Sequence, residues 1–419
     1  MKPLPSPCLS DWEKGKSILA ILLLTVAYCL CDWPASAQSY NSSIQPEVVS
    51  VLSPPNCSDI SGNMLLSISA PGMTSVKVRC WKQGPGMGSD SLVGTIMPDL
   101  HGNGSLMFPG NDYPHGPITV RFNGENGQAH NNFYLQLYNK GGVSWNEGIP
   151  ANPPPAAAGL SLLFADDFDK PLSISGKDSK ALYYDHKPGG GDFGLFHFTN
   201  DESPNNPFKQ IDTYLRIRAD ARTHTDGLIS SLKKDGTGFE VSAPCYFECR
   251  LLAPSDPGTW PAFWLMTDYM KNPDLSKGPA DELDVIEGYG GEGPHNPNSK
   301  GEYRVTTHFW NQGMLAKLQK HAALAVPMRK IGSGSSWWET FHTYGCKITE
   351  TDTIYYCDDI EVERDPTGPV SRDHPFFLMA NLAIGGNGWP VDLSRCGGLA
   401  DMYIDYIRVY GSPSVSPAP

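Results

Sequence analysis

Ala280-Asp-Glu-Leu-Asp-Val-Ile-Glu-Gly-Tyr289 has the most informative residue pattern in this chain. Three carboxylates stand among aliphatic residues, and the alternation predicts a β-strand. Residues i and i+2 of a strand share a face, so Glu282 and Asp284 point the same way. Strict alternation would send Glu287 to the other face, but a β-bulge within Val285-Ile286 would return it. Three acids on one face indicate proton chemistry, cation binding or simple solvent exposure on an acidic edge strand.

Composition limits the class of protein. The chain has 419 residues, 40% hydrophobic and 18% charged, which is enough for two folded domains with ample core. Its 43 glycines and 37 prolines, with little helical periodicity, favour an all-β fold. The net charge of −13 argues against nucleic acid as a partner and disfavours polyanionic polymers. A neutral substrate is easier to accommodate.

The first 37 residues have the features of an export signal. Lys14 and Lys16 precede the apolar run 17–30, and Ala35-Ser-Ala37 is a small-residue cleavage site. The apolar run is too short for a comfortable membrane span, and no later stretch is long enough to cross a bilayer. We therefore predict a signal peptide over residues 1–37 and a secreted protein, extracellular or periplasmic.

Cysteine spacing suggests a disulfide. Three of the ten cysteines lie in the predicted signal, which leaves seven in the exported chain. A hairpin centred on Thr351-Asp352 would set Cys346 opposite Cys357, so we predict a bridge between them. Cys57 and Cys80 are a second candidate pair.

Turn signals and composition divide the chain into parts. Residues 46–140 carry short strand-like runs, typical of an immunoglobulin-like β-sandwich, in which we expect Trp81, Tyr113 and Phe122 to be core residues. Residues 141–159 are rich in Pro, Gly and Ala and predict a linker. Residues 160–411 predict one large sandwich or barrel, able to fold and act alone, and residues 412–419 a disordered tail.

Aromatic residues flank the acidic strand in the sequence. Trp260 and Trp264 lie upstream, and His308 and Trp310 lie downstream. If these segments are neighbouring strands, indole rings come close to carboxylates, as in a sugar site where rings stack on sugars and acids cleave the linkage. The alternatives are tryptophans buried in the core and a hydrogen-bonded structural histidine.

Five blocks of sequence together resemble glycoside hydrolase family 16, which holds laminarinases, lichenases, agarases and κ-carrageenases. The resemblance covers about residues 160–410 and excludes the first domain. The blocks, in chain order, are Tyr246-Phe-Glu-Cys-Arg250, Trp260-Pro-Ala-Phe-Trp-Leu265, Glu282-Leu-Asp-Val-Ile-Glu287, Phe341-His-Thr-Tyr-Gly345, and Asn381-Leu-Ala-Ile-Gly-Gly386 with Tyr403-Ile-Asp-Tyr-Ile-Arg-Val-Tyr410. The bulged spacing is similar to that of the laminarinase, agarase and carrageenase branches.

The resemblance implies a concanavalin A-like jelly roll with the glycan in a cleft. It assigns Glu282 as nucleophile, Glu287 as acid/base, and Asp284 as the helper between them. We expect Trp260 and Trp264 to line donor-side subsites, and Asn381 and Trp389 to face the cleft as well. Asp281, where the family usually has Gly, is expected to face away from it.

The sequence thus predicts a secreted, endo-acting, retaining hydrolase of β-linked polysaccharide, with β-1,3-glucan as the expected substrate. An agarase or galactanase, a transglycosylase and a non-catalytic glycan-binding protein are the alternatives. The mechanism requires no cofactor and the protein is expected to be monomeric. Some relatives hold structural calcium, for which Asp167 and Asp405 are candidate ligands unless they are ordinary surface acids.

Overall fold

A computed structural model describes residues 49–82, 90–127, 130–143, 150–268, 278–291, 302–312, 323–332, 334–386 and 390–412. The predicted signal peptide and Trp389 lie outside these residues, as do positions 144–149 of the predicted linker and 413–419 of the predicted tail. Export and a disordered tail therefore stay predictions. Within the described part of the chain, no helix combines the length and apolar character needed to cross a membrane.

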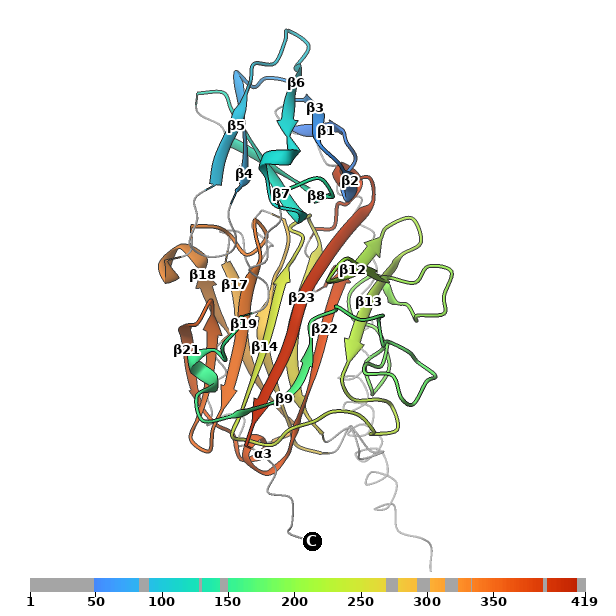
Figure 1. Ribbon diagram of the computed structural model, residues 1–419, viewed down its shortest axis with the longest axis vertical. Helices are drawn as coiled ribbons and strands as arrows, with labels where there is room; N and C mark the ends of the chain where they lie inside the picture. The colour runs from blue at the N-terminus through green and yellow to red at the C-terminus, as the bar shows by residue number, and fades with distance from the viewer. Residues whose placement is uncertain are drawn as a thin grey trace, which may run out of the picture. The chain divides into compact units, whose positions relative to one another are not determined.

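The first part of the chain forms two sheets around a core of its own (Figure 1). One sheet has the order β1-β3-β6 and the other the order β2-β8-β7-β4-β5. The strands are β1 (Ser50–Ser53), β2 (Ser58–Ile60), β3 (Asn63–Ser69), β4 (Ser75–Trp81), β5 (Asp90–Ile96), β6 (Asn103–Pro109), β7 (Gly116–Glu125) and β8 (His130–Asn139), with the short 3-10 helix η1 (Gly110–Asp112). An immunoglobulin-like strand order remains a prediction.

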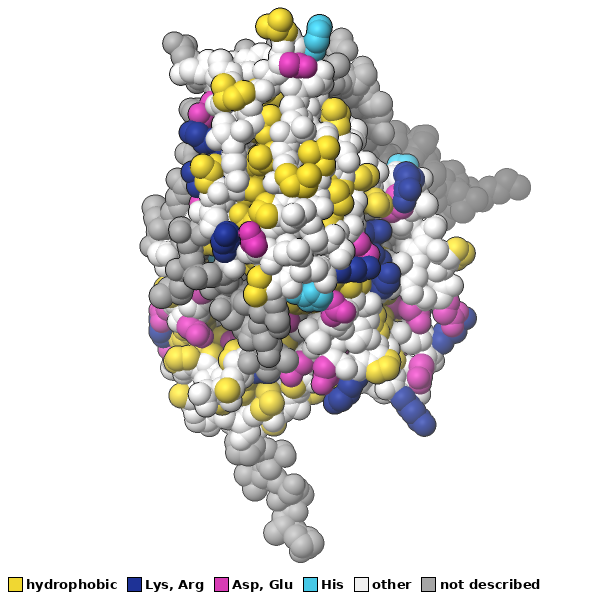
Figure 2. Space-filling view, turned by 45° about the horizontal axis from the view of Figure 1, so that its top comes forward, with side chains coloured by type: hydrophobic (Ala, Val, Ile, Leu, Met, Phe, Trp, Pro, Cys, Tyr) yellow, Lys and Arg dark blue, Asp and Glu magenta, His cyan; other side chains and the backbone are white. Residues whose placement is uncertain are grey.

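The aromatic residues of this first sandwich are used for packing. Trp81, Tyr113 and Phe122 are all buried, as predicted. Figure 2 shows hydrophobic side chains gathered on its surface as well. The large hydrophobic residues exposed on the described part of this sandwich are aliphatic: Leu52, Leu65, Leu92, Met97, Leu100, Met107 and Val143. A sugar-stacking platform needs aromatic rings, and this set of exposed residues has none.

Part of the stretch 150–159, within the predicted linker, packs against the following domain. Pro155–Ala157 form the 3-10 helix η2. Ala156 and Ala157 are buried in a small cluster with Tyr246 and Tyr410 of the following domain. The carbonyl of Pro150 accepts a hydrogen bond from Arg408 at 3.1 Å.

The larger domain consists of two curved β-layers, the jelly roll that the sequence predicts (Figure 1). The strands lie in the order β18-β17-β16-β15-β22-β13-β12-β23-β14-β19-β20-β21, and β9, β10 and β11 pair with β23, β13 and β12 in turn. Their bounds are β9 (Ser161–Asp166), β10 (His197–Phe198), β11 (Phe208–Ile211), β12 (Tyr214–Asp220), β13 (Thr225–Ser230), β14 (Cys245–Leu252), β15 (Thr259–Thr267), β16 (Ala280–Glu287), β17 (Glu302–Trp310), β18 (Leu324–Pro327), β19 (His342–Ile348), β20 (Asp352–Cys357), β21 (Ile360–Pro366), β22 (Phe376–Ile384) and β23 (Leu399–Gly411). The short helices are η4 (Met328–Ile331), α3 (Pro369–Asp373) and η5 (Ser394–Cys396).

The core lies between these layers and takes alternate residues from each. Phe263 and Leu265 of β15 point inward, as do Phe247 and Cys249 of β14. The intervening residues of β15, among them Trp264, face the other side of the sheet and pack in a smaller cluster there. That outer face carries the candidate site.

The predicted Cys346–Cys357 bridge is absent, because the register of the β19–β20 hairpin differs from the expected one. Cys346 lies opposite Tyr355, and Cys357 lies opposite Tyr344. Both cysteines are buried as free thiols. Cys57 and Cys80, the second candidate pair, are free as well.

Candidate active site

The acidic strand is β16, and it carries the predicted bulge. On one side Trp264 pairs with Asp284 and Phe263 with Ile286, so Val285 has no partner on β15. On the other side the register with β17 shifts between Asp284 and Glu287. Leu283, Val285 and Ile286 are all fully buried in the core. The extra inward residue returns Glu287 to the face of Glu282 and Asp284.

Glu282 is partly buried and held by an indole. Trp310 Nε1 donates a hydrogen bond to Glu282 Oε2 at 3.0 Å, and the Trp310 ring, 45% exposed, stacks on His308 at 5.3 Å. Burial raises the pKa of Glu282, while the positive charges of His308 and Lys187 and the Trp310 hydrogen bond oppose this rise.

Glu287 has a different set of partners. Trp260 Nε1 and the Tyr289 hydroxyl both donate to Oε1, at 3.1 and 2.8 Å. The Thr306 hydroxyl donates to Oε2 at 3.5 Å. The two glutamates are chemically identical, but their environments differ, and this difference can assign them different tasks.

Asp284 lies between the two glutamates on the strand and is only 4% exposed. Burial raises its pKa well above the ordinary range, and the charges of Glu287 and Glu282 raise it further. His308 Nε2 lies 3.2 Å from Asp284 Oδ2. A carboxyl whose pKa is raised in this way binds its proton more tightly than an ordinary Asp, and in its protonated form it can donate a hydrogen bond to a neighbouring carboxylate.

A cavity of about 490 Å³ opens over these acids. The described residues that line it come from β15, β16, β17, β22 and the segment before β10: Lys187, Gly189, Gly190, Phe193, Trp260, Ala262, Trp264, Met266, Glu282, Asp284, Glu287, Trp310 and Asn381. Asn381 Oδ1 accepts a hydrogen bond from Trp264 Nε1 at 2.9 Å, and its Nδ2 donates to the carbonyl of Trp260 at 3.2 Å. Asn381 therefore lines the cavity and holds the Trp264 side chain and the backbone at Trp260 in place.

The structure brings together every described residue that the sequence predicts for the cleft. Trp260, Trp264, Trp310 and Asn381 line the cavity with the three acids, and His308 contacts Asp284 from β17.

Sequence reasoning missed the segment that contains Lys187 and Phe193. It lies almost 100 residues before β16 and has no strand periodicity. Its one sequence signal is the glycine run that follows Lys187-Pro188. In the structure the Lys187 ammonium lies 5.4 Å from the Phe193 ring centre, and Phe193 packs edge-on against Trp260. Tyr289 was also missed, although it is the second residue after Glu287.

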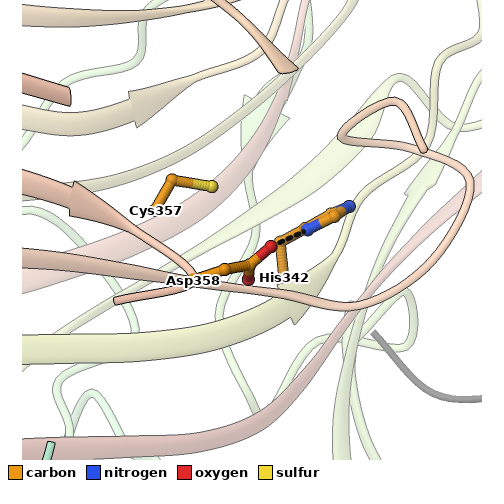
Figure 3. A group of neighbouring side chains, drawn as sticks. All are labelled: His342, Cys357 and Asp358. Atoms are coloured by element: carbon orange, nitrogen blue, oxygen red, sulfur yellow. Dashed lines mark hydrogen bonds and ion pairs between the residues drawn. The ribbon is translucent and has the colours of Figure 1, made fainter. Parts of the chain in front are cut away.

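Two groups of side chains are close enough to be considered as metal ligands. Glu282, Asp284 and His308 form one, which coincides with the acid cluster at the cavity. His342, Cys357 and Asp358 form the other (Figure 3). In this second group His342 Nδ1 contacts Asp358 Oδ2 at 2.7 Å and its Nε2 contacts the Ser335 hydroxyl at 2.9 Å. Both ring nitrogens are thus engaged, which makes this a structural relay rather than a metal site.

The predicted calcium ligands have arginine partners instead. Asp405 is buried and accepts a hydrogen bond from Arg250 at 2.5 Å. Asp167 accepts from Arg408 at 3.1 Å. Guanidinium groups already neutralise these acids, so this donor set does not fit Ca²⁺. The alternative of ordinary surface acids is also wrong for Asp405.

Asp281 faces away from the cavity, as expected, but it is fully buried. Its Oδ2 accepts from the backbone N–H of Ser371 at 2.9 Å and from the Ser371 hydroxyl at 2.5 Å, and Gln312 donates to Oδ1. The carboxylate that replaces the usual Gly therefore ties β16 to α3.

Comparison with known proteins agrees with this arrangement. Residues 204–408 match the family model described as glycosyl hydrolases family 16. The match covers just under half of the chain, and over these residues the chain is similar to glycosyl hydrolases family 16. The matched region holds the bulged acid motif, both tryptophans of β15 and Asn381, whereas the first sandwich and Lys187 lie outside it.

Two glycan-cleaving enzymes are similar to this chain over part of their length. It is 31% identical over 212 residues to an endo-1,3-1,4-β-glycanase, EglC, of Rhizobium meliloti (strain 1021), covering 49% of this chain and 40% of that protein. It is 27% identical over 318 residues to glucan endo-1,3-β-glucosidase A1 of Niallia circulans, covering 64% and 40%. The chain thus spans less than half of either relative. A laminarinase catalytic domain from Thermotoga petrophila RKU-1 aligns at 21% identity with a TM-score of 0.45, over 61% of this chain and 99% of that one.

Proposed function

We propose that this chain is an endo-acting, retaining glycoside hydrolase that cleaves β-1,3-linked glucan. The observation that carries the proposal is the bulge of β16, which sets three carboxylates in one row while giving each a different environment. Retaining hydrolysis needs two carboxyl groups on one sugar-binding face, one ionised and one protonated.

In the first step the Glu282 carboxylate attacks the anomeric carbon. The bond from that carbon to the linking oxygen breaks, and the oxygen takes its proton from Glu287. The Trp310 indole N–H holds Glu282 Oε2, which leaves Oε1 for the attack. Trp260 and Tyr289 fix Glu287 through Oε1. The product of this step is a glycosyl ester on Glu282 and a free sugar chain end.

In the second step a water molecule gives its proton to the Glu287 carboxylate and attacks the same carbon. The ester bond to Glu282 breaks and the carboxylate is restored. Two inversions leave the configuration unchanged. Burial and its charged neighbours raise the pKa of Asp284, and in its protonated form Asp284 can hydrogen-bond either glutamate as the charge shifts between them.

The cavity walls favour a neutral sugar polymer. Trp260, Trp264 and Phe193 offer ring faces and edges to the C–H-rich faces of pyranose rings. The names of the relatives point to β-1,3- and mixed-linked β-glycans, and this supports β-glucan over galactan as the substrate.

Purified full-length protein should release reducing ends from laminarin, with lichenan, agarose and carrageenan as the comparison set. The Glu282→Ala variant serves as the inactive control. Oligosaccharides of several lengths should appear early, since the proposed cleavage is internal. NMR of the first product should show the β-anomer. Binding of laminarin without any release would favour the glycan-binding alternative, and release from agarose alone would favour the galactanase.

A further inference from the structure

The loop of residues 335–341 lies directly behind the proposed acid/base. Its Trp337 is fully buried, and its indole N–H donates to the carbonyl of Glu302, the first residue of β17, at 3.0 Å. The same ring packs on Gly288, where an added Cβ would lie 2.7 Å from it. Gly288 is the residue after Glu287, so Trp337 fixes the backbone from which the Glu287 side chain projects.

This loop is anchored at its base by the His342 relay. His342 contacts Asp358 through Nδ1 and Ser335 through Nε2, and Figure 3 shows His342 pointing toward Asp358. Ser335 begins the loop and His342 follows its end. The relay therefore ties the two ends together at the turn between β20 and β21.

The other side of the loop is held by the first sandwich. The Arg121 guanidinium donates to Glu339 Oε1 at 2.5 Å, and the Thr119 hydroxyl donates to the carbonyl of Trp338 at 3.0 Å. The Tyr134 ring packs edge-on against Trp338, with ring centres 5.5 Å apart.

Glu339 is only 4% exposed, and its Oε2 accepts from the backbone N–H of Ser336 at 2.8 Å. Asp90 of β5 binds the second arm of Arg121. A buried carboxylate needs such a partner, because an unpaired charge at this burial is strongly unfavourable.

We propose that the first sandwich is a structural part of the active site, with Arg121 acting as a positioning residue for Glu287. The first sandwich holds Trp338 and Glu339, and this keeps the adjacent Trp337 against Gly288. The position of Trp337 in turn sets the direction in which the Glu287 side chain projects. The role of Glu287 rests on the proposed function. The contacts argue against a catalytic domain of residues 160–411 that acts alone.

The test is the Arg121→Met variant of the full chain, which keeps the alkyl stem and removes the ion pair. Two substrates report on it: a natural glucan, whose leaving group needs a proton, and an aryl glycoside, whose leaving group does not. Misplacement of the acid should lower kcat on the glucan by about 10- to 100-fold. The aryl glycoside should lose much less, and KM should change little for either. Glu339→Gln should repeat the pattern and serves if Arg121→Met fails to fold.

The matched control is Lys77→Met, which removes an ion pair to Glu125 on the same sandwich, away from the loop. It should leave both rates unchanged. Equal losses on both substrates in Arg121→Met, or no loss, would overturn the inference. A wild-type protein without hydrolase activity would instead remove the proposed function on which it rests.

Discussion

Glu282 and Glu287 are distinguished by what surrounds them, and their tasks can be separated by product chemistry. Glu287→Ala removes the proton donor and should lower kcat on glucan by about 10²- to 10⁴-fold. With an aryl glycoside the ester on Glu282 still forms, and azide, which needs no base, should rescue turnover and give the β-glycosyl azide. Glu282→Ala with azide should give the α-azide by one displacement. NMR of the azides reads the outcome, and the reverse pairing of products would exchange the two roles.

Lys187 offers a test of the electrostatics at the nucleophile. Burial raises the pKa of Glu282, and the ammonium of Lys187 opposes that rise. Glu282 must be ionised to attack, so activity is lost as the pH falls through its pKa. Lys187→Met removes the opposing charge, raises this pKa further, and should move the acidic limb of kcat/KM to higher pH.

Lys187→Arg is the matched control because it keeps the charge, and its acidic limb should stay in place. Complete pH profiles of the three proteins give the comparison. An acidic limb that stays fixed in Lys187→Met, or moves to lower pH, would show that Lys187 does not act on the nucleophile.

Among the elements, the β19–β20 hairpin shows how the position of a turn determines whether two cysteines can form a disulfide. The Thr349 side chain accepts hydrogen bonds from the backbone N–H groups of Thr351 and Asp352, at 3.2 and 2.8 Å. The turn therefore forms one residue earlier than the cysteine positions suggest. As a result Cys357 lies opposite Tyr344 of β19, two residues away from the expected Cys346. Cross-strand bonding needs directly opposed residues, so the thiols cannot meet.

We predict that alkylation of unreduced, denatured protein labels Cys346 and Cys357 stoichiometrically, as mass spectrometry of the peptides would reveal. Reduction should add no further label at these positions, and the melting temperature should not depend on reductant. A peptide pair that remains linked before reduction contradicts the observed register.

Much of the site could be predicted from local patterns, and the remainder could not. The spacing of the three acids predicts the bulge of β16, and the alternation of residues on β15 predicts that Trp260 and Trp264 share a face. Lys187 reaches the cavity through an irregular segment, for which no periodicity predicts a position. The partners of Asp405 are likewise invisible in sequence, since Arg250 lies 155 residues away on another strand.

At the scale of the whole molecule, the charge of −13 should influence which polymers approach the cavity. A carboxymethylated β-1,3-glucan should react more slowly than the neutral polymer at low salt, because like charges slow association by about tenfold or more. Raising the ionic strength to about 0.15 M shortens the Debye length to about 8 Å and should reduce the difference in rate between the two polymers. Initial rates across a salt series test this, with neutral glucan as the control. A rate difference that does not change with salt would show that the charged polymer is rejected inside the cavity and not during its approach.

The sequence divides the chain at residues 141–159, and composition alone favours two independent halves. The described residues instead show shared packing, with Tyr138 buried beside Tyr214, Phe341 and Tyr403 in one cluster. Residues at such an interface cannot be recognised from sequence periodicity, because within each half they follow the same alternation as other strand residues. The packing of one half against the other is therefore visible only in the structure.

The unpaired Val285 has a consequence for how such a gene can change length. Deleting its codon would restore strict alternation, and the three acids would still stand in one row, with one residue between each. Deleting the codon of Leu283 instead would set Glu282 and Asp284 side by side on opposite faces. One amino acid can therefore be gained or lost at Val285 without changing the order of the acids, whereas an alignment that places the gap outside residues 283–286 would leave one of the two glutamates paired with another residue.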